Sequence, residues 1–131
     1  MSQKRTRALP HDVHPAPVSG APSAATDGVS IAGCNTLVML VKETGGANNW
    51  TPKLYLYYPQ TNSAGAAHGW VEYDPGAAVN DHGGSIAPVS AGASVAYTFS
   101  NIVGASRAYV QKSAGSGTAV CAIVALYDGG A

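Results

Sequence analysis

The stretch of residues 107–127 places the strongest constraint on the fold, because two strand-like segments flank a Gly-rich turn. The second segment is apolar at almost every position and includes the β-branched residues Val120, Ile123 and Val124. Such a segment is too short and too rich in β-branched residues for a helix, and it is typical of a central strand covered on both sides. With the turn at 114–117, the stretch predicts a hairpin that closes the fold.

Further strand-like stretches recur between residues 27 and 106, and no intervening segment has the periodicity of an amphipathic helix. The predicted strands are residues 29–31, 34–43, 53–58, 69–74 and 94–100. Short strands at this spacing predict an all-β fold, an antiparallel β-sandwich or jelly roll with an extended N-terminal arm.

The predicted strand at 53–58 has two different faces. Alternation places Leu54, Leu56 and Tyr58 on one face, and Tyr55 and Tyr57 on the other. One face is therefore aliphatic and the other phenolic, and we expect the phenolic face to pack against a neighbour.

Charged residues make up only 11 % of the sequence, and seven Lys and Arg balance seven Asp and Glu. Soluble monomers usually carry about 25 % charged residues and a net charge away from zero. Large areas of this surface must therefore be uncharged, which favours packing against neighbouring subunits, and we expect a homo-oligomer. A secreted β-sandwich, which can be similarly rich in Ser, Thr and Gly, stays open as an alternative.

Residues 1–26 differ in composition from the rest of the chain. They contain four of the eight prolines and three of the seven basic residues, Lys4, Arg5 and Arg7. Because proline lacks the backbone donor that strands and helices need, we expect an extended, basic arm of polyproline type ahead of a β-sandwich domain at 27–131. The three basic side chains are the predicted partner contacts of this arm. A disordered tail is the alternative.

The basic N-terminus is not followed by an apolar run, so it does not resemble a secretory signal. No segment approaches the roughly 20 apolar residues that cross a bilayer, and we expect cytoplasmic synthesis and no membrane partner. Residues 27–131 contain four basic and six acidic residues, so we expect no specific nucleic-acid partner.

The two cysteines, Cys34 and Cys121, lie within apolar predicted strands and have no metal-like or redox-like partner nearby in the sequence. Cytoplasmic synthesis favours two small buried thiols over a disulfide. Whether the two cysteines pair stays open, because geometry alone decides it.

No catalytic or cofactor-binding motif stands out in the chain. The sequence lacks a Gly-x-Ser-x-Gly elbow, and no lysine follows the Gly-rich turn as a phosphate loop requires. Glu72 and Asp74 share one face of a predicted strand, and Asp81 and His82 follow in a turn. These four could approach one another as metal ligands, but a solvated strand end and a turn are their ordinary interpretation. We therefore predict no enzymatic activity, no cofactor and no metal site.

Five aromatic residues leave two interpretations open: Trp50, Tyr55, Tyr57, Trp70 and Tyr73. On the outer face of a sandwich, such rings form a protein interface or a sugar-binding platform. Alternatively, both tryptophans belong to the core, because a chain with only one Phe needs other large side chains to fill its core.

The order of arm, short strands and low-charge Ala- and Gly-rich surface resembles the small virion proteins of tailed bacteriophages. The resemblance extends to the final segments, Arg-x-Tyr-Val-Gln from Arg107 and Ala-Val-Cys-Ala-Ile-Val-Ala-Leu-Tyr-Asp-Gly-Gly from Ala119. It is closest to capsid decoration (cement) proteins, which commonly form β-rich trimers and use an extended arm to lock onto neighbouring subunits.

This resemblance implies a non-enzymatic structural protein of the virion that binds the outer capsid and stabilises the shell. It implies a homotrimer, with the major capsid protein or another virion protein as the partner. Similar sandwiches occur in phage neck, tail and fibre proteins, so these roles stay open, as does a carbohydrate-binding β-sandwich module.

Overall fold

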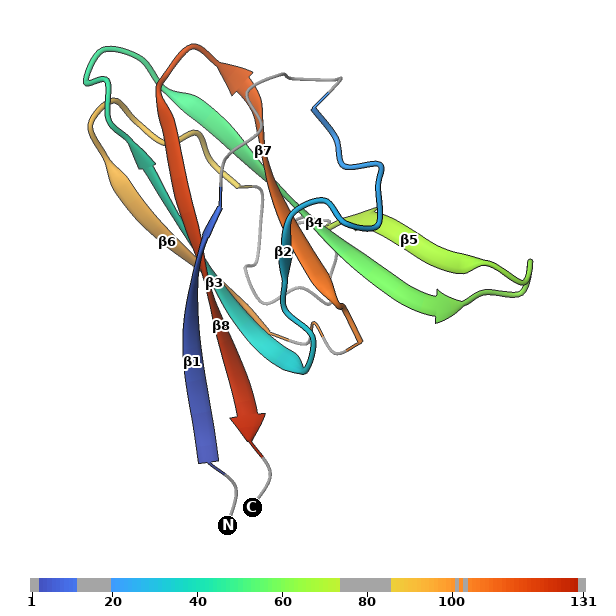
Figure 1. Ribbon diagram of the computed structural model, residues 1–131. Helices are drawn as coiled ribbons and strands as arrows, with labels where there is room; N and C mark the ends of the chain where they lie inside the picture. Colours follow the sequence, from blue (N-terminus) through green and yellow to red (C-terminus); the bar gives the residue numbers. More distant parts are fainter. Residues whose placement is uncertain (1–2, 12–19, 74–85, 101, 103, 130–131) are drawn as a thin grey trace.

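The computed structural model of the protein describes residues 3–11, 20–73, 86–100, 102 and 104–129, with the backbone alone at 3–5, 10–11 and 128–129. Eight strands lie in these residues (Figure 1). They are β1 (Gln3–His11), β2 (Val29–Ser30), β3 (Cys34–Glu43), β4 (Trp50–Thr61), β5 (Ala67–Glu72), β6 (Ser94–Phe99), β7 (Arg107–Gly115) and β8 (Ala119–Gly129).

The strands form two four-stranded sheets, in the orders β1-β8-β3-β6 and β2-β7-β4-β5. Every pairing within the two sheets is antiparallel. The sheets pack together, and the predicted all-β antiparallel sandwich is therefore confirmed.

The core lies between the sheets and follows the two-residue alternation of the strands. In β4, Leu54 and Leu56 point into the core, whereas Tyr55 and Tyr57 lie on the opposite side, as the alternation predicted. Large side chains without any exposed surface fill the space between the layers: Ile31, Leu37, Met39, Trp50, Phe99, Ile102 and Ile123.

The predicted closing hairpin is wrong in its pairing, although both of its strands exist. β7 pairs with β2 and β4, and β8 pairs with β1 and β3, so the two strands belong to different sheets. Their short connection crosses from one layer to the other. Gly115 turns there with a φ of 90°, and a Cβ at this position would lie 2.4 Å from the carbonyl oxygen of Asn49. Close packing of the corner against the start of β4 therefore determines the connection.

The predicted central position of the last strand is confirmed, because β8 lies between β1 and β3. Cover on both of its sides was also expected, and this is wrong for the outer side. Cys121, Ile123 and Ala125 are buried between the sheets, but Val120 is 48 % exposed.

The first strand occupies residues where the sequence predicted a polyproline-type arm. This strand, β1, pairs with β8, so that Gln3 lies opposite Gly129 and His11 lies opposite Cys121. β1 is therefore an edge strand of its sheet. Pro10 is compatible with this position, because an edge strand leaves one row of backbone groups unpaired. The free edge of β8 supplies hydrogen-bond partners that local sequence patterns do not reveal.

A buried carboxylate joins three loops at one end of the sandwich. Glu43 ends β3, and its side chain is 1 % exposed. Oε1 accepts hydrogen bonds from the backbone N–H groups of Gly46 (2.7 Å) and Gly92 (2.9 Å), and Oε2 accepts from Gly45 (2.8 Å) and Thr118 (2.7 Å). These bonds, that from Gly92 foremost, lower the pKa of Glu43 to about 2.

We expect Glu43→Gln to destabilise the protein at neutral pH, because an amide presents its own N–H donors to backbone donors. The native pKa of about 2 lies below the ordinary 4.5. The stabilisation is therefore complete above the ordinary pKa and is lost as the pH falls towards 2. Thermal melting between pH 7 and pH 2 should show the largest difference from wild type at pH 7 and almost none near pH 2.

Glu72→Gln is the matched control, because this carboxylate is exposed and forms only a surface ion pair with Lys53. Its melting curve should follow that of wild type. Equal pH profiles for wild type and Glu43→Gln would contradict the role assigned to the buried carboxylate.

Candidate protein interface

The outer face of the β1-β8-β3-β6 sheet carries exposed apolar side chains. Along β3, Leu37, Met39 and Val41 point into the core, so Val38 and Leu40 point outward. Leu40 is 39 % exposed. This face continues across all four strands of the sheet.

The register aligns the outward side chains in rows across the sheet. In one row, Val124 lies between Ala8 and Val38, and Val38 lies opposite Thr98. In the next row, Leu40 lies between Ala122 and Ala96. We call the outward side chains of this sheet the uncharged face: Thr6, Ala8, Thr36, Val38, Leu40, Ser94, Ala96, Thr98, Val120, Ala122, Val124 and Leu126.

Lys42 lies at one end of the uncharged face, where the register places it between Val120 and Ser94. It is the one charged group on the outer side of this sheet among the side chains that the structure describes. The face is therefore built from small and apolar residues with hydroxyl groups towards its edges. Contiguous apolar surface of this kind marks sites of protein interaction.

A shallow hollow of about 410 Å³ lies within this face, towards its Lys42 end. Its lining includes the small side chains of Ala96 and Ala122 and the larger side chains of Leu40 and Val120. Small side chains next to larger ones thus give the face a relief that a partner's apolar side chain can fill.

Aromatic side chains gather on the outer face of the other sheet. Tyr57 lies opposite Trp70, and Tyr55 lies opposite Tyr109, by the pairing of β4 with β5 and β7. The rings meet edge to face, with centroids 5.3 Å apart for Tyr57 and Trp70, 6.0 Å for Trp70 and Tyr109, and 6.3 Å for Tyr55 and Tyr109. We call these four residues the aromatic cluster.

Tyr109 was missing from the predicted set of aromatics. It lies on the same face of β7 as Arg107 and Gln111, and this two-residue spacing was the signal available in the sequence. Tyr109 is nevertheless buried although it points outward, because another part of the chain lies over it. Sequence patterns do not reveal such cover.

The covering segment is residues 20–28, which we call the strap. The Tyr109 hydroxyl donates a hydrogen bond to the carbonyl oxygen of Gly20 (2.6 Å), and Nε1 of Trp70 donates to that of Ala24 (2.9 Å). Burial, with a smaller contribution from the Asp27 carboxylate, raises the pKa of Tyr109 to about 12. The hydroxyl therefore remains a donor at neutral pH.

Arg107 fixes the other end of the strap. Its Nε donates to the carbonyl oxygen of Asp27 (2.7 Å), and Nη2 donates to those of Thr26 and Gly28 (both 2.9 Å). A Cβ at Gly28 would lie 2.1 Å from the carbonyl oxygen of Ala108, so the strap lies directly on β7. The planar guanidinium holds three successive carbonyl groups in one geometry.

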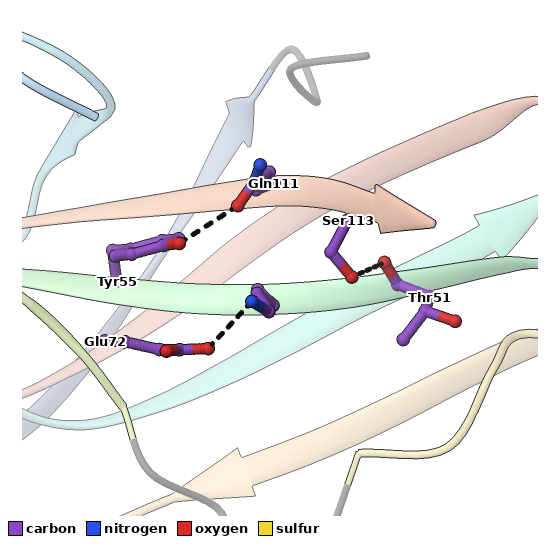
Figure 2. Close-up of polar contacts among 6 residues, drawn as sticks. Thr51, Tyr55, Glu72, Gln111 and Ser113 are labelled. Atoms are coloured by element: carbon purple, nitrogen blue, oxygen red, sulfur yellow. Dashed lines mark hydrogen bonds and ion pairs between the residues drawn. The ribbon is translucent and has the colours of Figure 1, made fainter. Parts of the chain in front are cut away.

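A polar set continues the same outer face beyond the aromatic cluster (Figure 2). The Tyr55 hydroxyl donates to Oε1 of Gln111 (3.0 Å), and Oγ of Ser113 donates to the carbonyl oxygen of Thr51 (3.0 Å). Gln111 is buried, so the bond from Tyr55 satisfies an oxygen that water does not reach.

The structure separates the five aromatics singled out from the sequence. Tyr55, Tyr57 and Trp70 belong to the aromatic cluster. Trp50 has no exposed surface and donates from Nε1 to the carbonyl oxygen of Lys42 (3.2 Å), which corrects the surface role that the sequence left open for it. Tyr73 packs edge to face on Phe99 of the core, with ring centroids 4.7 Å apart.

Glu72 forms an ion pair with Lys53, with 3.4 Å between Oε1 and Nζ (Figure 2). Its proposed companions Asp74, Asp81 and His82 lie outside the described residues. Within the part of the chain that is described, no three His, Cys, Asp or Glu residues are close enough to hold a metal ion.

The two cysteines lie at opposite ends of one sheet. In the strand register Cys34 lies opposite Tyr127 and Cys121 lies opposite Val41, and the two cysteines do not form a disulfide with each other. Sγ of Cys34 donates a hydrogen bond to the carbonyl oxygen of Thr36 (2.9 Å), and burial raises the pKa of this thiol. In this fold the cysteines are separate buried thiols.

The predicted arm contacts Lys4, Arg5 and Arg7 lie on β1, whose backbone pairs at these positions with residues 125–128 of β8. The Arg7 side chain is exposed. It lies beside Tyr127, where its guanidinium opposes the rise that burial causes in the pKa of the tyrosine.

A scan against protein-family models, a search of curated proteins and a search of solved structures each found no match to this chain. The described part of the chain contains no helix with the length and hydropathy needed to cross a bilayer.

We expect Arg107→Ala to release the strap, because it removes three hydrogen bonds from one guanidinium. The free energy of unfolding should fall by about 1–3 kcal/mol. Amide hydrogen exchange should accelerate within residues 20–28 while β3 and β8 remain protected. Lys53→Ala is the control on the same outer face and should leave this exchange unchanged. Unchanged protection of the strap in Arg107→Ala would contradict its anchoring by Arg107.

Proposed function

We propose that this protein is a non-enzymatic structural protein of a virion, a capsid decoration protein that binds the outer capsid and stabilises the shell. The observation that carries the proposal is the uncharged face, which spans four strands and meets a charged side chain only at Lys42 among the described residues. A surface of this kind is suited to burial in an assembly and poorly suited to a solvated monomer.

The hairpin of β4 and β5 supplies a second surface of the same character. Residues 54–71 contain no Asp, Glu, Lys or Arg, and Figure 1 shows the end of the hairpin extending away from the other strands. A hollow of about 380 Å³ on it is lined by Tyr58, Gln60, Thr61, Asn62, His68 and Val71. A two-stranded ribbon beyond the body of a domain gains stability when a neighbour packs on it.

The arrangement of the aromatic cluster favours a structural role over carbohydrate binding. Its rings meet edge to face, and the strap accepts the hydrogen bonds of Trp70 and Tyr109. A sugar platform needs an open ring face with polar groups free beside it. The aromatic cluster instead serves to hold the strap on the sandwich.

Stabilisation of the shell follows from binding alone. A protein that binds the assembled capsid and not its separated subunits shifts the equilibrium towards the assembled state. No catalytic group is needed, and the size of the effect depends on affinity and concentration.

We expect the full-length protein to co-sediment with capsids of the virus that encodes it, assembled without this protein, and to raise their disruption temperature in calorimetry. Capsids that neither bind the protein nor gain stability would overturn the proposal. Binding only to isolated tails or necks would do so as well.

We expect the triple variant Lys4→Gln, Arg5→Gln and Arg7→Gln to bind capsids about tenfold more weakly, because the basic side chains of β1 are the proposed arm contacts. The difference should shrink as the salt concentration rises. Lys53→Gln, which removes a cation from the other sheet, is the control and should bind as wild type does. Equal affinities of the triple variant and wild type would exclude these contacts.

A further inference from the structure

The two outer faces of the sandwich differ in what lies over them. The strap covers part of the β2-β7-β4-β5 sheet and is fixed by Arg107, Trp70 and Tyr109. On the β1-β8-β3-β6 sheet, the described segments leave Leu40 and Val120 exposed by 39 % and 48 %. The uncharged face is therefore an apolar surface without a second layer from the described part of its own chain.

We propose that a second copy of this chain covers the uncharged face, packed sheet to sheet about a two-fold axis that lies in the interface and perpendicular to the strands. The inference deepens the proposed function by naming the partner of one surface. It departs from the trimer that the resemblance implied, because a two-fold contact is closed by two copies.

The area of the face is sufficient for a stable dimer. Four strands about 4.8 Å apart, each about nine residues long at roughly 3.3 Å per residue, present about 570 Å². Two copies would then bury about 1,100 Å², which reaches the range of about 1,000–1,200 Å² where specific interfaces begin. Two sheets of the same protein also pack readily at the usual separation of about 10 Å.

The position of the charge selects the direction of the axis. A two-fold axis parallel to the strands and through the middle of the sheet would place β3 of each copy over β8 of the other and keep both Lys42 side chains at the same end, so that like charges would be buried near each other. An axis perpendicular to the strands keeps β3 over β3 but reverses its direction. With the axis between the rows of Val38 and Leu40, Lys42 lies over Thr36 of the second copy, at the far end of the face.

The relief of the face agrees with the same axis. The hollow lies towards the Lys42 end, and the larger side chains Val124 and Leu126 lie in the two rows at the other end. When the direction of the second copy is reversed, its Val124 row faces the row of Ala122 and Leu40. The parallel arrangement would instead place hollow against hollow, which leaves an unfilled space.

Sedimentation equilibrium of the isolated full-length protein at micromolar concentration tests the inference. We expect a dimer. Leu40→Glu and Val120→Glu should each raise the dissociation constant by about 100-fold or more, because a carboxylate would be buried without a partner. Both positions are exposed in the single chain, so circular dichroism should show an unchanged fold. Ala114→Glu, at an exposed position of β7 on the other sheet, is the matched control and should remain dimeric.

A second pair of variants tests the axis. Thr36→Glu should be tolerated with Lys42 in place, since the two side chains would form an ion pair between copies, and it should disrupt the dimer when combined with Lys42→Gln. Equal weakening in both backgrounds would overturn the two-fold arrangement. A monomeric wild type, a trimer, or a dimer that Leu40→Glu and Val120→Glu leave intact would overturn the inference.

These measurements need no capsid, so they fail or succeed independently of the proposed function. A dimer that does not bind capsids would remove the decoration role and leave the self-association in place. A monomer that binds and stabilises capsids would do the reverse.

Discussion

The carboxylate of Glu43 is the interaction on which the arrangement of the two sheets depends. A buried charge is tolerated only where donors replace water, and four backbone N–H groups do so here. The donors come from the loop after β3, from the turn before β6 at Gly92, and from Thr118 between β7 and β8. The Glu43 side chain thus holds the connection between β7 and β8, where the chain passes from one sheet to the other.

The same corner explains why two adjacent strands do not form a hairpin. Gly115 and Gly117 approach the backbone at Asn49 too closely for a Cβ, and the N–H of Gly117 donates to the carbonyl oxygen of Asn49 at 2.8 Å. Contacts to a distant segment therefore replace the local pairing. Because β8 then lies between β1 and β3, its outward side chains belong to the outer face of this sheet and do not lie in the core between the sheets.

The sandwich presents two surfaces with different chemistry, and the proposals rest on this contrast. One face is partly covered by the strap, which Arg107, Trp70 and Tyr109 hold by hydrogen bonds to its carbonyl oxygens. The other consists of small and apolar side chains. The fold does not assign a role, since unrelated functions use the same architecture. The composition of the exposed face is what favours assembly, because such a surface is more stable when buried.

The sequence by itself predicted strands at β2 to β8, although not their exact ends, and it predicted the two sides of β4. It did not predict β1, because the partners of that strand come from distant β8. Alternation in β4 separated Leu54 from Tyr55, because neighbouring residues of a strand point in opposite directions. The low charge of the chain likewise required uncharged surface somewhere. Only the tertiary structure decided where that surface lies, that Trp50 fills the core, and that the strap buries Tyr109. These outcomes depend on pairing between segments far apart in the chain, which no local pattern records.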